Sequence, residues 1–94
     1  MSLTRIYRKS PVEVEVAGPI TPENIEEVAR WCKGRCGPIG EAHEFIWLNP
    51  SDDYPDIAQI GDFVVYDPNS ALATHEGFVA VDRLSFAKGY QEVG

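Results

Sequence analysis

Valine and glutamate alternate along residues 12–16 of this chain. Successive side chains of a β-strand point to opposite faces, so the valines would share one face and Glu13 and Glu15 the other. Pro11 stands at the beginning of this segment, where a missing backbone N–H does least harm to a sheet. The pattern predicts a strand with one buried and one solvated face, the buried positions being Val12, Val14 and Val16.

The next segment has the signals of an amphipathic helix. Thr21 suits the N-cap, because its hydroxyl accepts hydrogen bonds from the first turn, and Pro22 suits the first helical position. Gly34 is expected to end the helix. Trp31 lies on the flank of the apolar stripe, where packing against the protein is favoured over contact with a partner. The stripe itself consists of Ile25, Val28, Ala29 and Cys32.

Short apolar runs predict the strands of the second half of the chain. The run Phe45–Leu48 is apolar throughout, so we expect a buried strand there. Further strands are expected over residues 57–60, 63–66 and 78–81, and the last two of these would pair as a hairpin.

The C-terminal pattern changes from strand to helix. Asp82 would cap a short helical turn, in which Leu84, Phe86 and Ala87 are the apolar residues and after which Gly89 ends the turn. The whole order predicts a single α+β domain over residues 1–94. In it, one amphipathic helix packs on a small, mainly antiparallel sheet of roughly four to five strands, with a short helical turn near the C-terminus.

The charge of the chain is acidic, with a formal net charge of −7 over 94 residues. Nucleic-acid binding draws its affinity from Lys and Arg, so this balance argues against direct contact with DNA or RNA. The chain has no apolar run long enough for a membrane span and no secretory signal pattern. We expect a cytoplasmic protein without membrane insertion, whose acidic surface serves solubility or meets a basic partner. A homodimer would be a further source of buried surface for a domain of this size.

Two cysteines and two histidines are the candidates for reactive or metal-binding chemistry. Cys32, Cys36, His43 and His75 could together supply the ligands of a zinc ion, but their spacing is irregular and Cys32 belongs to the buried stripe. Cys36 with His43 could form a nucleophilic pair, yet the C-terminal end of a helix raises the pKa of a thiol. We therefore expect no metal site, no cofactor and no enzymatic activity.

An acidic segment and a turn are the candidate partner-binding sites. Asp52, Asp53 and Asp56 surround Tyr54, and an aromatic residue flanked by carboxylates can anchor a protein interface. The same carboxylates could bind calcium, but the spacing of an EF-hand loop is missing. His75 and Glu76 mark the tip of the connection between the last two strands and complete the predicted binding surface.

The order of motifs along the chain resembles a family of small bacteriophage accessory proteins of unassigned function, common in tailed phages, including those of actinobacteria. A YRKxPVxVE start is followed by a helix that ends in Trp-Cys, a GDxVV strand and an aromatic-rich end. The matching residues are Tyr7, Arg8, Lys9, Pro11, Val12, Glu15, Asn24, Glu27, Val28, Trp31, Cys32, Gly61, Asp62, Phe63, Val64, Val65, Phe78, Phe86, Tyr90 and Val93. The resemblance implies a non-virion protein made inside the infected cell, and it carries over no catalytic residue.

Four functions remain open from the sequence. The leading hypothesis is a phage-encoded protein that binds a host bacterial protein and modulates or inhibits it during infection. The alternatives are an acidic mimic of nucleic acid, a minor virion or assembly component, and a small hydrolase or metal-dependent enzyme that uses Cys36 and His43.

Overall fold

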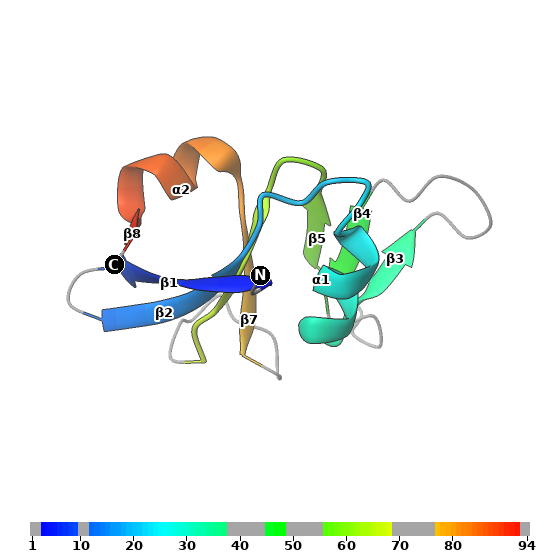
Figure 1. The fold of residues 1–94 in the computed structure, drawn as a ribbon, viewed down its shortest axis with the longest axis horizontal. Helices are drawn as coiled ribbons and strands as arrows, with labels where there is room; N and C mark the ends of the chain where they lie inside the picture. Colours follow the sequence, from blue (N-terminus) through cyan, green and yellow to red (C-terminus); the bar gives the residue numbers. More distant parts are fainter. Residues whose placement is uncertain (1–2, 10–11, 38–44, 49–55, 69–76, 93–94) are drawn as a thin grey trace.

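The computed structural model describes residues 3–9, 12–37, 45–48, 56–68 and 77–92, and the predicted α+β fold is confirmed (Figure 1). Within these residues, ten elements follow one another: β1 (Thr4–Lys9), β2 (Val12–Ala17), α1 (Ile25–Trp31), β3 (Arg35–Gly37), β4 (Phe45–Leu48), β5 (Asp56–Gln59), β6 (Phe63–Tyr66), β7 (Phe78–Val81), α2 (Arg83–Gly89) and β8 (Gln91–Glu92). The strands form two sheets, one with the order β7-β6-β2-β1-β8 and one with the order β3-β4-β5. All their pairings are antiparallel.

The five-stranded sheet carries α2 on one face, above β1 and β2 in Figure 1. The predicted alternation of β2 is confirmed for Val14 and Val16, which are buried and cluster with Val65 and Phe86, while the side chain of Val12 lies outside the described part of the structure. The side chain of Phe86, from α2, closes this small core. Its ring stacks on that of Phe63 with centroids 3.9 Å apart.

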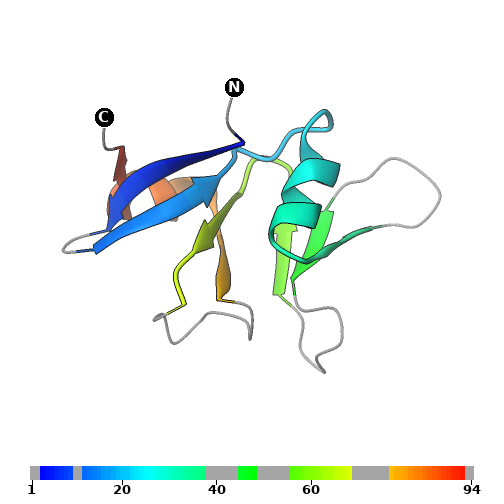
Figure 2. The same ribbon diagram turned by 60° about the horizontal axis from the view of Figure 1, so that its bottom comes forward.

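A larger core lies between α1, the three-stranded sheet and the β6–β7 hairpin. Here α1 covers the three-stranded sheet, as Figure 2 shows. The predicted stripe of α1 is buried, and Trp31 packs edge-on against Phe78 with ring centroids 5.0 Å apart, as expected for a flanking residue. The side chains that are almost completely buried include Ile20, Ile25, Val28, Ile46, Leu48 and Val64. The described residues thus form two sheets where the sequence predicted one, and the predicted short helical turn near the C-terminus is α2.

Two backbone hydrogen bonds connect Ile20, in the segment between β2 and α1, to the turn between β5 and β6. The Ile20 N–H donates to the carbonyl of Asp62 (2.9 Å), and the Gly61 N–H donates to the carbonyl of Ile20 (2.9 Å). Gly18 lies beside them at φ +141°, and a Cβ on this residue would come within 2.8 Å of Cδ2 of Phe63. The lack of a side chain at Gly18 therefore lets the chain leave β2 close to the beginning of β6.

The predicted cap Thr21 holds the turn that leads into α1, while the N-cap position of α1 itself is Asn24. The Thr21 hydroxyl accepts from the Asn24 N–H (3.2 Å), while Oδ1 of Asn24 accepts from the Thr21 N–H (2.8 Å). This reciprocal pair satisfies donors that a helix start leaves free. The Ile25 N–H already donates to the Thr21 carbonyl (3.0 Å). Residues 22–24 form a turn, so the regular helix begins at Ile25, later than Pro22 suggested.

The C-terminus of α1 differs from the expectation for Gly34. The residue with the left-handed conformation is Lys33, at φ +59°, and the Gly34 N–H donates to the Ala29 carbonyl (2.8 Å). A Cβ on Gly34 would lie 2.7 Å from both Cγ2 of Ile46 and the carbonyl oxygen of Trp47. Gly34 is therefore required by the close approach of β4, and the left-handed turn falls on a lysine.

Candidate functional site

The partner-binding residues predicted from the acidic segment and the turn are mostly outside the described residues. These are Asp52, Asp53, Tyr54, His75 and Glu76. Asp56 is described only in its backbone, which begins β5 and pairs with Leu48 of β4. The prediction for this surface therefore stays a prediction, and the described residues offer two other surfaces.

The first surface is the face of the three-stranded sheet that points away from α1. Ile46 and Leu48 are fully buried beneath α1, so Trp47 between them points to the opposite side of the strand. The expectation of a completely buried strand at 45–48 is therefore wrong for Trp47, which keeps 39% of its surface exposed. The physical reason is that α1 covers one face of the sheet and no described element covers the other. An apolar residue thus lies at an outward position of a paired strand.

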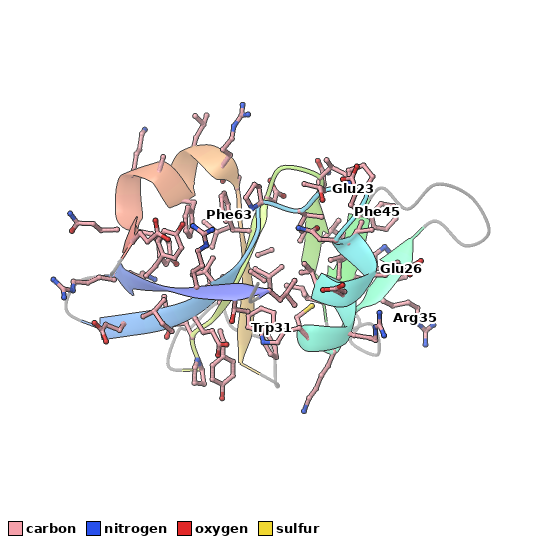
Figure 3. All side chains as sticks on the ribbon, viewed as in Figure 1. Glu23, Glu26, Trp31, Arg35, Phe45 and Phe63 are labelled. Atoms are coloured by element: carbon pink, nitrogen blue, oxygen red, sulfur yellow. The ribbon has the colours of Figure 1, made fainter. Side chains whose placement is uncertain are left out.

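The residues of this surface follow from the register of β3, β4 and β5. Trp47 is opposite Arg35 on one side and Ile57 on the other, and Phe45 is opposite Gln59. Ile57 is 47% exposed, and the rings of Phe45 and Trp47 stack with centroids 6.0 Å apart. Figure 3 shows Arg35 projecting from β3 away from the body of the protein. This surface, the outer face, consists of Arg35, Phe45, Trp47, Ile57 and Gln59.

The backbone under the outer face is paired on both sides and packed against the end of α1. β4 is the central strand of its sheet, and the backbone of Trp47 lies against Gly34 at the end of α1. An exposed aromatic side chain on a fixed backbone loses little conformational freedom when a partner covers it. Aromatic residues and arginine are enriched in protein interfaces, and exposed apolar patches often mark them. The outer face can therefore contribute apolar contact area, with one cation at its border.

The second surface is an open groove of about 420 Å³ over β1, β2 and β6. It lies on the face of the five-stranded sheet opposite α2, since Val14 and Val16 point toward α2 and Glu15 between them points away. The Glu15 groove, as we name it, is lined by Ile6, Glu13, Glu15, Tyr66, Asp67 and Pro68, with Val14 at its base.

Ion pairs connect the basic residues of β1 to carboxylates on neighbouring segments. Nη1 of Arg5 lies 3.1 Å from Oε2 of Glu92 in β8. Arg8 pairs with Glu13, and Lys9 pairs with Asp67, each at 3.8 Å. Each of the three cations of β1 is therefore paired with a carboxylate from a neighbouring segment.

The two thiols have environments that favour the protonated form. Cys32 is buried, and its Sγ donates to the Ala29 carbonyl at 3.6 Å; burial raises the pKa of Cys32 to about 11. Burial and the charge of Glu26 raise the pKa of Cys36, whose Sγ donates to the Ile25 carbonyl at 3.7 Å. A protonated thiol is a poor nucleophile and a poor metal ligand, so neither cysteine is activated. His43 and His75 lie outside the described residues.

Within the described ranges, no group of three or more His, Cys, Asp and Glu side chains could hold a metal ion. Neither of the two described helices is long and apolar enough to cross a membrane. No known protein family, curated protein or solved structure matches the chain.

The exposure of Trp47 and the Glu15 groove were both missed from the sequence. The run Phe45–Leu48 has no polar residue to reveal its period, so nothing in it distinguishes the inward from the outward positions. The groove depends on β1, which the sequence reading did not assign as a strand, and on β6, which is distant in the chain. The only strand signal in β1 was weak, because Ile6 and Tyr7 are adjacent and do not alternate with polar residues.

Proposed function

We propose that the protein is a phage-encoded, non-virion protein that binds a host protein through the outer face and changes the activity of that protein in the cytoplasm of the infected bacterium. The phage origin and the host cell are supported by the sequence resemblance described above. The binding surface is supported by one observation, the exposure of Trp47 and Ile57 side by side on paired strands.

The chemistry of the outer face favours binding of a protein. Isolated apolar residues are normal on a protein surface, but here a tryptophan, an isoleucine and a half-buried phenylalanine adjoin one another on one face. Burial of such side chains by a partner removes apolar area from water and contributes affinity that depends little on salt. Arg35 at the border can add orientation through a hydrogen bond or ion pair.

The alternative of nucleic-acid mimicry is supported by the net charge of −7 but less by the described surface. A mimic needs carboxylates that replace the phosphates of a nucleic-acid strand. Along β1 and its neighbours, the carboxylates of Glu13, Asp67 and Glu92 are paired with cations. This interleaving reduces the negative potential that a DNA-binding protein would recognise.

Affinity capture tests the proposal. The tagged protein would be exposed to a bacterial lysate at about 0.1 M and about 0.5 M salt, since high salt screens surface charge pairs. Captured proteins would be identified by mass spectrometry for the wild type, for Trp47→Ala and for the control Leu84→Ala. Leu84 is 70% exposed on α2, so its loss removes an exposed apolar side chain from another surface.

We expect one dominant partner that persists at high salt, disappears with Trp47→Ala and remains with Leu84→Ala. A partner captured equally well by the Trp47→Ala variant would refute the role of the outer face. A set of DNA-binding proteins that is lost at high salt would instead establish mimicry.

A further inference from the structure

Three side chains of the Glu15 groove form one row across three strands. Ile6 of β1 is opposite Glu15 of β2, and Glu15 is opposite Tyr66 of β6. Side chains at registered positions of neighbouring antiparallel strands have Cβ atoms roughly 5 Å apart. The carboxylate of Glu15 therefore lies between an aliphatic and an aromatic side chain, which are 44% and 40% exposed.

Glu15 has no cation as a partner among the described residues. Its Oε2 accepts a hydrogen bond from the Thr4 hydroxyl at 2.6 Å, and it forms none of the ion pairs found in the described part of the chain. The nearby cations are engaged, since Arg8 pairs with Glu13 and Lys9 with Asp67. The Thr4 hydroxyl is neutral, so within the described ranges no cation pairs with the half-buried Glu15 carboxylate.

Tyr66 is held in place at the opposite wall. Its ring contacts that of Phe78 with centroids 5.1 Å apart. On Gly77, a Cβ would come within 3.0 Å of Cε1 of Tyr66, so the ring lies directly over the glycine backbone. This support fixes the ring while a large part of the side chain stays exposed to the groove.

We propose that the Glu15 groove binds a single arginine side chain of a protein partner. The guanidinium would form an ion pair with the Glu15 carboxylate and lie against the ring of Tyr66, while the methylene groups of the arginine side chain contact Ile6. A carboxylate next to an exposed aromatic ring suits a guanidinium, which forms charge-assisted hydrogen bonds in its plane and stacks on π-systems with its face. The net charge of −7 also favours the approach of a basic segment.

This inference rests on the proposed function only in the assumption that the arginine belongs to a protein. The outer face is composed of residues from β3, β4 and β5, and the Glu15 groove of residues from β1, β2 and the β6 region, so the two surfaces share no residue. The two assignments can therefore fail separately.

A titration followed by nuclear magnetic resonance tests the groove directly. The ¹⁵N-labelled full chain would be titrated at constant ionic strength with Nα-acetylarginine amide and, separately, with Nα-acetylcitrulline amide. Citrulline has nearly the shape of arginine without its charge. We expect chemical-shift changes centred on the amides of residues 6, 15 and 66, with an apparent affinity about threefold higher for the arginine compound, the size typical of an exposed ion pair.

Variants separate binding from a structural role. Glu15→Gln retains an acceptor for the Thr4 hydroxyl, so the sheet should stay folded while the preference for arginine over citrulline disappears. The matched control Glu23→Gln removes a carboxylate from an exposed position before α1 and should leave that preference unchanged. Trp47→Ala should also leave it unchanged, so that loss of host-protein capture by this variant reports on the outer face alone.

Several outcomes would overturn the proposal. Shift changes spread over the amides of acidic residues throughout the chain would indicate general electrostatic attraction. If Glu15→Gln kept the preference for arginine over citrulline, a group other than Glu15 would form the ion pair with the guanidinium. Equal affinity for Nα-acetyllysine amide would show that the planar guanidinium has no special role in the groove.

Discussion

The two sheets of this protein each have one face covered by a helix, but the two helices are held differently. α1 buries Ile25, Val28 and Ala29 in the core that it shares with the three-stranded sheet and the β6–β7 hairpin, and Cys32, directly after the helix, is buried there too. α2 has the same length, seven residues, yet Phe86 is its only buried residue. The attachment of α1 is thus distributed over a stripe, whereas that of α2 depends on one aromatic ring.

The uncovered faces of the same sheets differ as well. Opposite α2, Val64 and Phe78 belong to the larger core, and the open part of this face carries Ile6, Glu15 and Tyr66 beside the Arg8–Glu13 ion pair. Opposite α1, the outer face presents Trp47 and Ile57 with little charge. The open part of the first face is polar, whereas the outer face is an exposed apolar surface, and the partner-binding proposal rests on that surface. Each of the two surfaces proposed for binding thus lies on the sheet face opposite its helix.

The largest effect is expected from Phe86→Ala. The Phe86 ring stacks on Phe63 at 3.9 Å and on Tyr90 at 4.7 Å, and it meets the edge of Tyr7 at 4.7 Å. Its removal should lower the free energy of unfolding by about 3–5 kcal/mol, the range for large aromatic residues in cores. Urea denaturation measures this change. The control Leu84→Ala, on the same helix, should change the free energy by about 0.5 kcal/mol or less. Equal losses in both variants would contradict the dependence of α2 on a single ring.

Gly34→Ala tests how closely α1 is joined to its sheet. The new Cβ would lie 2.7 Å from the Trp47 carbonyl oxygen, a backbone atom that cannot move away, so we expect a loss of about 1–3 kcal/mol in the free energy of unfolding. Gly89→Ala is the matched control, since a Cβ there meets nothing within 4 Å.

Lys33→Gly should act in the opposite direction and stabilise by up to about 1 kcal/mol, because it relieves the positive φ of a lysine. Thermal unfolding monitored by circular dichroism distinguishes the three variants, and a neutral Gly34→Ala would disprove the close approach.

The parts of this fold that follow from local chemistry were predictable from the sequence. The turn held by Thr21, the cap by Asp82 and the burial of Val14, Val16 and Phe86 each depend on residues a few positions apart. Local patterns of this kind are readable because a helix has a period of 3.6 residues and a strand a period of two.

The candidate surfaces depend on register and on which face each helix covers, and these are long-range properties. The row Ile6–Glu15–Tyr66 joins strands that are as far apart as β2 and β6 in the chain. The division of the strands into two sheets decides whether Trp47 is buried, and no residue within 45–48 carries that information. The left-handed conformation of Lys33 was missed because lysine does not favour that conformation, whereas glycine does and Gly34 is the next residue.

Trp47→Ala should have a smaller effect on stability than on binding. The side chain is 39% exposed and makes a stacked contact with Phe45, so its loss should lower the free energy of unfolding by roughly 1 kcal/mol. Urea denaturation beside the affinity capture described above gives both quantities for one variant. A loss of stability as large as that of Phe86→Ala would place Trp47 in the core and remove the contrast between covered and uncovered faces.

The smallest effect concerns Asp82, which caps α2. Its Oδ1 accepts from the Ser85 N–H at 2.9 Å and its Oδ2 from the Ser85 hydroxyl at 2.9 Å, and these hydrogen bonds lower the pKa of Asp82. Because the pKa is lower in the folded state, this stabilisation is complete above the pKa of the unfolded chain and is lost as the pH falls through the folded value.

Asp82→Asn keeps an oxygen for the cap but has no titrating carboxyl. The difference in urea midpoint between wild type and this variant should therefore shrink when the pH is lowered from about 7 to about 2, well below the ordinary pKa of an aspartate. The remaining carboxyl groups titrate in both proteins, so their contributions to the pH dependence of stability cancel in the difference. A difference that stays constant over this range would mean that the charge of the Asp82 carboxylate does not contribute to stability, and that the cap acts through its hydrogen bonds alone.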